Sequence, residues 1–224
     1  MSVRDIFNAV LNFNIETISD LVKVELNAGT NTKSILNDGL IAAMDEVGRR
    51  FSAGEFYIPE MLVAAKVMQM GMDVLKRDIV KTDVRPYGTV VIGTVRGDLH
   101  DIGKNLVVMM LEGSGFDVID LGINVDTIEF LEAVKEHDVK IVGLSALLTA
   151  TMQEMEKTIA SLRKKHPDVK VMVGGAPLSQ AFADSIKADG YGKDAPSAVR
   201  LVRKFLKLSR SHDQNKEKDY HGLF

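Results

Sequence analysis

A histidine between an aspartate and a glycine is the group of residues best suited to chemistry. Asp98, His100 and Gly103 form the pattern Asp-x-His-x-x-Gly, which follows an apolar run over 89–95 and precedes a helix-like run from Lys104. One imidazole nitrogen can bind a metal ion while a nearby carboxylate accepts a hydrogen bond from the N–H of the other nitrogen. The glycine leaves space where a bulky planar group could pass. The pattern alone is loose, and a solvated loop histidine is the common alternative.

Hydroxyl side chains follow a second apolar run, over 139–144. Ser145 and Thr149 fall on the turn between this run and the next predicted helix, and Thr151 falls at the start of that helix. Their hydroxyls can donate or accept hydrogen bonds inside a largely apolar slot. Serine and threonine also cap helices routinely, so Ser145 and Thr149 could instead cap the helix that begins near Thr151.

Two adjacent glycines, Gly174 and Gly175, follow a third apolar run, over 169–173. Glycine permits a backbone approach that other residues prevent. Because Pro177 comes soon afterwards, the pair could also be only a turn. All three sets of residues follow predicted strands, and the carboxyl ends of strands are where open α/β sheets bind ligands.

The second part of the chain alternates between strand-like and helix-like segments. This alternation predicts an α/β fold, a doubly wound (Rossmann-like or flavodoxin-like) five-stranded parallel sheet with helices on both faces. The predicted strands cover 89–95, 116–121, 139–144, 169–173 and, more weakly, 187–191, and the predicted helices cover 103–113, 126–136, 151–165, 178–186 and 195–208.

The first part of the chain has helical periodicity throughout. A short helix over 3–11 and three further apolar faces, within 15–26, 36–51 and 61–75, predict a four-helix bundle. The methionines at 61, 68, 70 and 72 are expected in its core. We therefore expect a helical cap over 1–83, an α/β domain over 84–208 and a polar tail over 209–224, with a linker at 81–88.

Composition excludes several classes of function. The net charge of −3 gives no reason to expect nucleic-acid binding. No apolar run reaches the roughly 18 residues of a membrane span, and the N-terminus has no signal-peptide pattern, which favours the cytoplasm. The absence of cysteine excludes disulfides, thiolate zinc sites and iron–sulfur clusters held by this chain alone.

The three motifs together resemble a known signature. Asp98-x-His100-x-x-Gly103, then Gly143-Leu-Ser145-x-Leu147-x-Thr149-x-Thr151, then Gly174-Gly175, is similar to the three-part signature of cobalamin-binding domains. The leading bundle, with the segments 46–51 and 56–61, resembles the helical cap before such domains in methyltransferases, including cobalamin-dependent methionine synthase. Over about residues 1–208 the chain looks most like the free-standing corrinoid proteins of methylamine, methanol or betaine demethylation systems.

The resemblance implies a role for each motif residue. His100 would bind cobalt from the lower face and displace the cofactor's own benzimidazole base, and Asp98 would hydrogen-bond the other ring nitrogen. Thr151 falls where the family often places a serine that continues this relay. The other motif residues would contact the corrin or its nucleotide tail: Asp101, Ile102, Gly103, Ser145, Leu147, Thr149, Gly174 and Gly175.

The resemblance also implies a function. The chain would be a methyl carrier, a subunit of a methyltransferase system and not a complete enzyme. Its expected partners are a substrate-specific methyltransferase, a second methyltransferase acting on coenzyme M or tetrahydrofolate, and a reductive activase. The cap would cover the upper corrin face and swing aside about the linker. Alternatives are a cobalamin-dependent sensor, the cobalamin-binding subunit of a mutase, and a flavodoxin-like or receiver domain without a corrin.

Overall fold

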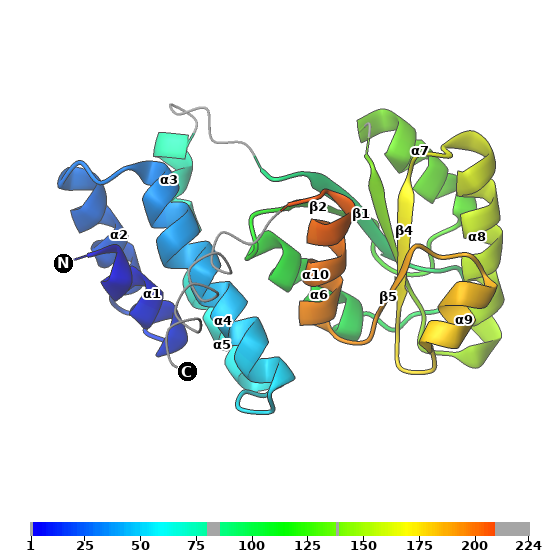
Figure 1. The fold of residues 1–224 in the computed structure, drawn as a ribbon, viewed down its shortest axis with the longest axis horizontal. Helices are drawn as coiled ribbons and strands as arrows, with labels where there is room; N and C mark the ends of the chain where they lie inside the picture. Colours follow the sequence, from blue (N-terminus) through cyan, green and yellow to red (C-terminus); the bar gives the residue numbers. More distant parts are fainter. Residues whose placement is uncertain (1, 80–85, 138, 209–224) are drawn as a thin grey trace, which may run out of the picture.

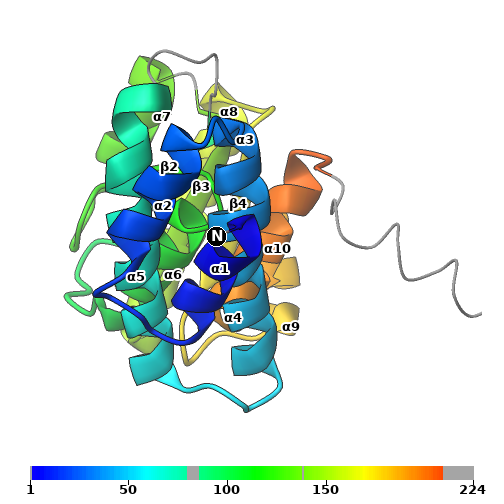
Figure 2. The ribbon, with the colours of Figure 1, turned by 90° about the vertical axis from the view of Figure 1, so that its left-hand side faces the viewer.

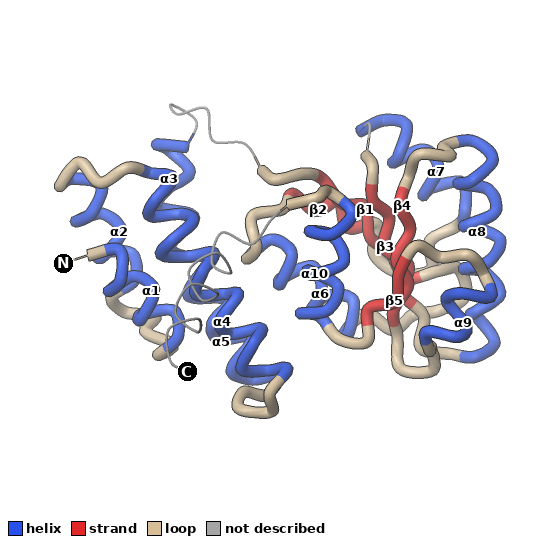
Figure 3. The backbone as a smooth tube through the Cα atoms, in the orientation of Figure 1, coloured by secondary structure: helices blue, strands red, loops and turns tan. Residues whose placement is uncertain are grey.

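The α/β half of the chain is a parallel sheet whose strand order reverses near its middle. A computed structural model describes residues 2–79, 86–137 and 139–208. Its sheet has the order β2-β1-β3-β4-β5 with every pair parallel, which confirms the predicted fold (Figures 1 and 3). From β1 the chain moves first to one side and then to the other, so the switch point lies between β1 and β3. The strands are β1 (Thr89–Thr94), β2 (Asp117–Asp120), β3 (Ile141–Ser145), β4 (Lys170–Gly174) and β5 (Gly190–Gly192).

Helices cover both faces of this sheet, as the near-continuous apolar strands require. On the face toward the bundle lie α6 (Ile102–Glu112) and α10 (Ala195–Phe205). On the opposite face lie α7 (Thr127–His137) and α8 (Met152–Lys165), with the short α9 (Gln180–Ser185) beside β5. Two apolar clusters result, one on each face of the sheet.

The last strand is the main error in the predicted elements. A strand was expected over 187–191, but β5 covers only Gly190–Gly192. Lys187 adopts the left-handed conformation, with φ of 58°, and its amide bonds back to the carbonyl of Asp184. The chain is therefore still turning out of α9 at this point and cannot be extended.

The first part of the chain is the expected helical bundle, with one irregularity. It contains α1 (Val3–Leu11), α2 (Ile18–Asn27), α3 (Thr32–Ser34), α4 (Ala42–Ser52) and α5 (Ile58–Ile79). Between α3 and α4, residues Ile35–Ile41 form a π-helix, which apolar periodicity did not indicate. Met61 and Met68 are buried in the bundle core, as predicted, and Met70 and Met72 pack against it partly buried.

The bundle packs directly on α6 and α10. A side chain at Gly48 of α4 would lie 3.2 Å from Met110 of α6, and one at Gly113 would lie 3.2 Å from Met44 of α4, so the helices approach closely. Arg203 of α10 bonds Asp45 of α4 at 2.7 Å. The apolar cluster is continuous from the bundle to one face of the sheet. Figure 2 shows this arrangement from the bundle side.

Three predictions lie outside the described residues: the boundary at residue 83, most of the linker, and the tail over 209–224. At the end of the linker, Tyr87 is described: its ring packs on Phe116 and its hydroxyl donates to Asn37 of the bundle. Across the described ranges, none of the helices combines the length and apolarity that crossing a membrane requires.

Candidate functional site at the switch point of the sheet

The loop after β1 is held from several directions. The buried hydroxyl of Thr94 donates to the carbonyl of His100 at 3.0 Å. The amide of Gly97, whose φ of 81° suits glycine, donates to the side chain of Asn124 at 2.7 Å. The amide of Asn124 in turn donates to the carbonyl of Asp98 at 3.0 Å. These bonds fix the backbone of the loop before its functional side chains are considered.

Asp98 is the centre of the site. Its carboxylate is fully buried and accepts five hydrogen bonds. Oδ1 accepts from the amide of His100 at 3.1 Å and faces its Nδ1 at 2.8 Å. Oδ2 accepts from the amides of Leu147 and Leu148, at 2.8 and 3.1 Å, and from the hydroxyl of Thr151 at 2.7 Å. One carboxylate therefore ties the loop after β1 to the loop after β3.

The surroundings of Asp98 keep it ionised. Burial alone raises the pKa of its carboxyl group, but the hydrogen bonds from His100, Thr151, Leu147 and Leu148 outweigh burial and hold the pKa well below its usual range. An ionised carboxylate can only accept hydrogen bonds. Nδ1 of His100 must therefore carry a hydrogen, which leaves Nε2 as the basic nitrogen of the neutral imidazole.

His100 presents this nitrogen at the edge of the sheet. Its side chain is 50 % exposed, and Nε2 makes no hydrogen bond to any residue that the structure describes. Large apolar side chains around it are also exposed: Leu99 at 66 %, Ile102 at 75 %, and Leu147 and Leu148 at 42 and 43 %. An apolar surface around an oriented imidazole is suited to a broad apolar ligand that the imidazole binds through Nε2.

Gly103 leaves room for such a ligand. A side chain added there would meet no atom within 4 Å, so packing within the protein does not require glycine.

The turn between α4 and α5 lies at the same end of the molecule as the loop after β4, toward the bottom of Figure 1. At this turn the bundle also exposes apolar side chains, Tyr57 and Ile58.

The hydroxyl residues after β3 divide into two groups. Thr151 is buried, and its single hydroxyl hydrogen lies within reach of both Asp98 Oδ2 and the carbonyl of Leu148, at 2.7 and 2.8 Å. The side chains of Ser145 and Thr149 make no hydrogen bond within the described ranges, and neither caps the short 3-10 turn Thr149–Thr151 or α8. The capping alternative for these two residues is therefore not supported.

The glycine pair is required by the backbone itself. Gly175 has φ of 138°, and a side chain there would lie 1.9 Å from the carbonyl oxygen of Ala146. A side chain at Gly174 would lie 3.1 Å from the carbonyl oxygen of Gly192. The carbonyl of Gly175 accepts from the amide of Leu178, so the pair also forms a turn. Gly175 thus permits a close approach between the loops after β3 and β4, and Gly174 permits one between β4 and β5. Contact with a ligand stays a prediction.

Sequence reasoning missed Lys104. This lysine lies in the first turn of α6, and its side chain is only 2 % exposed. Nζ donates to Asp120, at the end of β2, at 2.5 Å and to the side chain of Asn105 at 2.7 Å. The one available signal was its position, since a cation in the first turn of a helix opposes the helix dipole.

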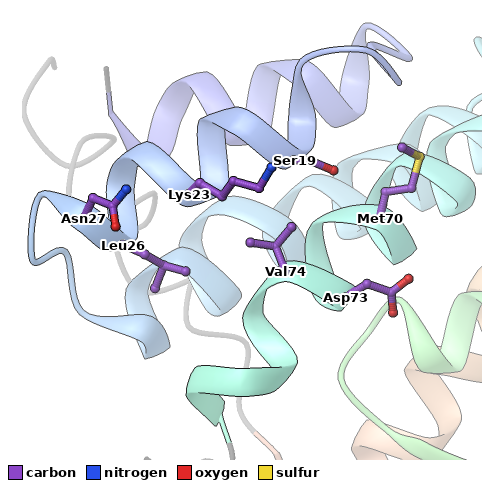
Figure 4. A pocket seen from close by; sticks show the side chains of 7 residues that line it. All are labelled: Ser19, Lys23, Leu26, Asn27, Met70, Asp73 and Val74. Carbon is purple, nitrogen blue, oxygen red and sulfur yellow. The ribbon is translucent and has the colours of Figure 1, made fainter.

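Two hollows among the described residues lie away from the histidine loop. One of about 690 Å³ lies between α2 and α5 (Figure 4), and one of about 900 Å³ lies among α1, α4 and α10. His137 is the last residue of α7 and His166 is the C-cap of α8, so both imidazoles lie at helix ends away from the site. Among the described residues no group of three or more His, Cys, Asp or Glu side chains could hold a metal ion. At the site itself, Nε2 of His100 is the exposed nitrogen that can bind a ligand.

Comparison with known proteins identifies the class to which this fold and site belong. Residues 88–200 match the family described as the B12 binding domain, and residues 3–76 match a second family of the same description. The trimethylamine corrinoid protein 1 of Methanosarcina acetivorans is 39 % identical over 203 residues, which cover 89 % of this chain and 94 % of that protein.

Two solved structures resemble most of the chain. A cobalamin-binding protein from Desulfitobacterium hafniense DCB-2 is 31 % identical and has a TM-score of 0.76, over 91 % of this chain and 98 % of that one. A chain of the methanol:cobalamin methyltransferase complex from Methanosarcina barkeri is 26 % identical and has a TM-score of 0.82, over 96 % of this chain and 83 % of that one.

The fold and the site define a cobalamin-binding α/β domain joined to a helical bundle. The chain belongs to the corrinoid proteins, which confirms both the resemblance and the predicted cofactor.

Proposed function

We propose that this chain is the methyl carrier of a methyltransferase system and holds its corrinoid through His100. The observation that carries the proposal is the buried, ionised Asp98, which fixes Nδ1 of His100 and leaves Nε2 exposed as a basic nitrogen. The relative described as a trimethylamine corrinoid protein and the neighbour from a methanol:cobalamin methyltransferase complex support the assignment to methyl transfer.

The residues present fit a corrinoid. Such a cofactor is a broad ring with apolar faces and already supplies most of the ligands of its metal, so the protein needs to add one nitrogen. His100 offers that nitrogen, and the exposed Leu99 and Ile102 offer an apolar surface beside it. The open space at Gly103 admits a large group where a side chain would stand.

In this proposal the motif residues share the binding. Nε2 of His100 would hold the metal, and Asp101, Ile102 and Gly103 would lie against the ring. The slot for the nucleotide tail is assigned to residues of the loops after β3 and β4: Ser145, Leu147, Thr149, Gly174 and Gly175. When bound, the corrinoid supplies a cobalt centre that can accept a methyl group and give it up.

Asp98 and Thr151 control the protonation of the imidazole. The carboxylate keeps a proton on Nδ1, so Nε2 can act as a ligand without first losing a hydrogen. Thr151 steadies this carboxylate by donating to the oxygen that does not face His100.

The proposal implies partner enzymes. A substrate-specific methyltransferase would bring the methyl group from a small methylated compound of the methylamine, methanol or betaine type. A second methyltransferase would pass it to coenzyme M or tetrahydrofolate, and a reductive activase would restore oxidised cobalt. Some of the exposed apolar side chains at the edge of the sheet and at the start of α5 would contact the cofactor, and others would contact these partners.

Replacing the imidazole tests the proposal. The chain is loaded with cobalamin and reduced to the cob(II) form, whose electron paramagnetic resonance spectrum detects an axial nitrogen. Wild-type protein grown with ¹⁵N-histidine is expected to show the isotope in the splitting, and His100→Ala is expected to lose it and to slow methyl transfer from the partner. His166→Ala, which removes an imidazole at the end of α8, is the matched control. A histidine splitting that survives in His100→Ala contradicts the proposal.

A further inference from the structure

A buried lysine lies beside the histidine loop, and neither ligand binding nor the relay through Asp98 uses it. Lys104 follows His100 by four residues, and its side chain is 2 % exposed. Lysine is almost never buried unless it is paired, because an isolated charge is costly to remove from water. Its place in the first turn of α6 also opposes the helix dipole, so helix stability does not account for it.

The partners of Lys104 form a chain of hydrogen bonds that leads to the histidine loop. Nζ donates to Asp120 Oδ2 at 2.5 Å, and Asp120 Oδ1 accepts from the amide of Gly122 at 2.9 Å. The turn after β2 therefore anchors one end of this series of hydrogen bonds. Nζ also donates to Asn105 Oδ1 at 2.7 Å. The amide nitrogen of the Asn105 side chain then donates to Asp101 Oδ2 at 3.1 Å. Asp101 directly follows His100.

This chain diverts Asp101 from the role its position predicts. Asp101 is the N-cap residue of α6, where an aspartate normally accepts hydrogen bonds from the amides of the first turn. Within the described residues its side chain makes no such bond and instead accepts from Asn105. Because Lys104 occupies the oxygen of the Asn105 amide, the nitrogen of that amide is the end that faces Asp101.

We propose that Lys104 is a positioning residue for His100: together with Asp120 and Asn105 it fixes the Asp101 carboxylate and so the segment that carries the imidazole. Asp98 orients the ring from the buried side, and Lys104 fixes the backbone on the other side of the same residue. The importance of this position for metal binding rests on the proposed function, but its effect on the loop does not. A ligand held by one imidazole depends on a rigid supporting backbone.

The test compares Lys104→Met with Lys157→Met. Lys157 also forms an ion pair, with Glu154 at 2.6 Å, but it lies exposed on α8, where such a pair contributes little. In the cofactor-free protein, amide exchange over residues 99–105 is expected to rise about tenfold in Lys104→Met. Exchange in α8 is expected to stay unchanged, and Lys157→Met is expected to resemble the wild type.

A second readout follows the cofactor. In protein loaded with cob(II)alamin, the fraction with a histidine nitrogen on cobalt is expected to fall by at least about twofold in Lys104→Met. If wild-type protein has no histidine splitting, the proposed function is wrong, whereas the exchange measurement still decides the role of Lys104. Folded Lys104→Met protein with unchanged exchange over 99–105 overturns the proposal.

Asn105→Leu covers the case in which Lys104→Met does not fold. This variant removes the link to Asp101 but keeps the pair between Lys104 and Asp120. Exchange over 99–105 is expected to rise in the same way, with a smaller loss of stability. If exchange there stays at the wild-type rate, Lys104 does not act through Asn105 and the proposal is overturned.

Discussion

Replacing Asp98 with asparagine is expected to change which nitrogen of His100 carries the hydrogen. Three donors point at Oδ2, from Leu147, Leu148 and Thr151, whereas two donors on His100 point at Oδ1. The asparagine oxygen therefore takes the Oδ2 position, and its NH₂ group faces His100. Nδ1 can accept from this group only without its own hydrogen, so the hydrogen moves to Nε2.

The cost of this change follows from the bonds lost. The amide of His100 loses its acceptor, and a hydrogen bond to a charged group contributes about 1.5–3 kcal/mol. The imidazole keeps one bond by changing its tautomer. We therefore expect Asp98→Asn to lower the free energy of unfolding by about 2–3 kcal/mol. Nε2 then carries a hydrogen and is no longer a ready metal ligand, which is expected to reduce the histidine-bound fraction of cofactor.

Nitrogen NMR of the cofactor-free protein measures the tautomer directly. The spectrum is recorded at about pH 8, above the ordinary histidine pKa of about 6.5. The signal of His100 among the five histidines is assigned from His100→Ala. Urea denaturation gives the stability, and Asp168→Asn, at an exposed turn before β4, is a control expected within about 0.5 kcal/mol of wild type. A hydrogen that remains on Nδ1 in Asp98→Asn would refute the reasoning.

The contribution of Asp98 to the free energy of unfolding should depend on pH. The pKa of Asp98 is lower in the folded chain than in the unfolded chain, because four groups of hydrogen-bond donors outweigh the effect of burial. Its stabilising contribution is therefore complete above the ordinary aspartate pKa of about 4 and is lost as the pH falls below that value. The difference in unfolding free energy between wild type and Asp98→Asn should shrink over this range. A difference that stays constant between pH 6 and pH 3 would show that the pKa is not depressed.

The remaining predictions concern Thr151 and the glycines. Thr151→Val removes the hydroxyl that donates a hydrogen bond to Asp98. It should lower the free energy of unfolding, measured by urea denaturation, by about 1–2 kcal/mol without changing the tautomer of His100. Thr151→Ser should keep this hydrogen bond. Gly175→Ala should cost more than about 3 kcal/mol, because the new carbon would overlap the carbonyl of Ala146. Gly103→Ala should leave the stability of the cofactor-free protein intact or higher and weaken cofactor retention, since only a ligand would meet the added methyl group.

Most helices and strands of the fold could be predicted from local patterns of apolar residues. The central strands β1 and β3 are buried on both faces, and their continuous apolar residues, such as Val90–Ile92, made them visible in the sequence. Periodicity did not reveal the π-helix Ile35–Ile41, because the apolar residues there fit an ordinary α-helical face equally well. Nor could it place β5, whose three residues carry little pattern of their own.

Contacts in the site could be predicted where both residues belong to one short motif. They could not be predicted where the hydrogen-bonding residues are distant in sequence. Asp98 and His100 are two residues apart, so their bond could be anticipated. The amides of Leu147 and Leu148 reach the same carboxylate from 49 and 50 residues away, and backbone donors leave no mark on residue type. Lys104 was overlooked because its partner Asp120 is brought beside it only when β2 pairs with β1.

The packing of the bundle limits how the predicted swing of the cap can occur. Met44 of α4 and Met110 of α6 are both buried where the bundle meets the α/β domain. Exposing two buried methionines costs about 3–6 kcal/mol, so a separated state would hold fewer than about one molecule in a hundred without a partner. A swing therefore requires a partner whose binding offsets this cost. A smaller movement at the α4–α5 turn, where Tyr57 and Ile58 are already exposed, would leave the contact between α4 and α6 intact.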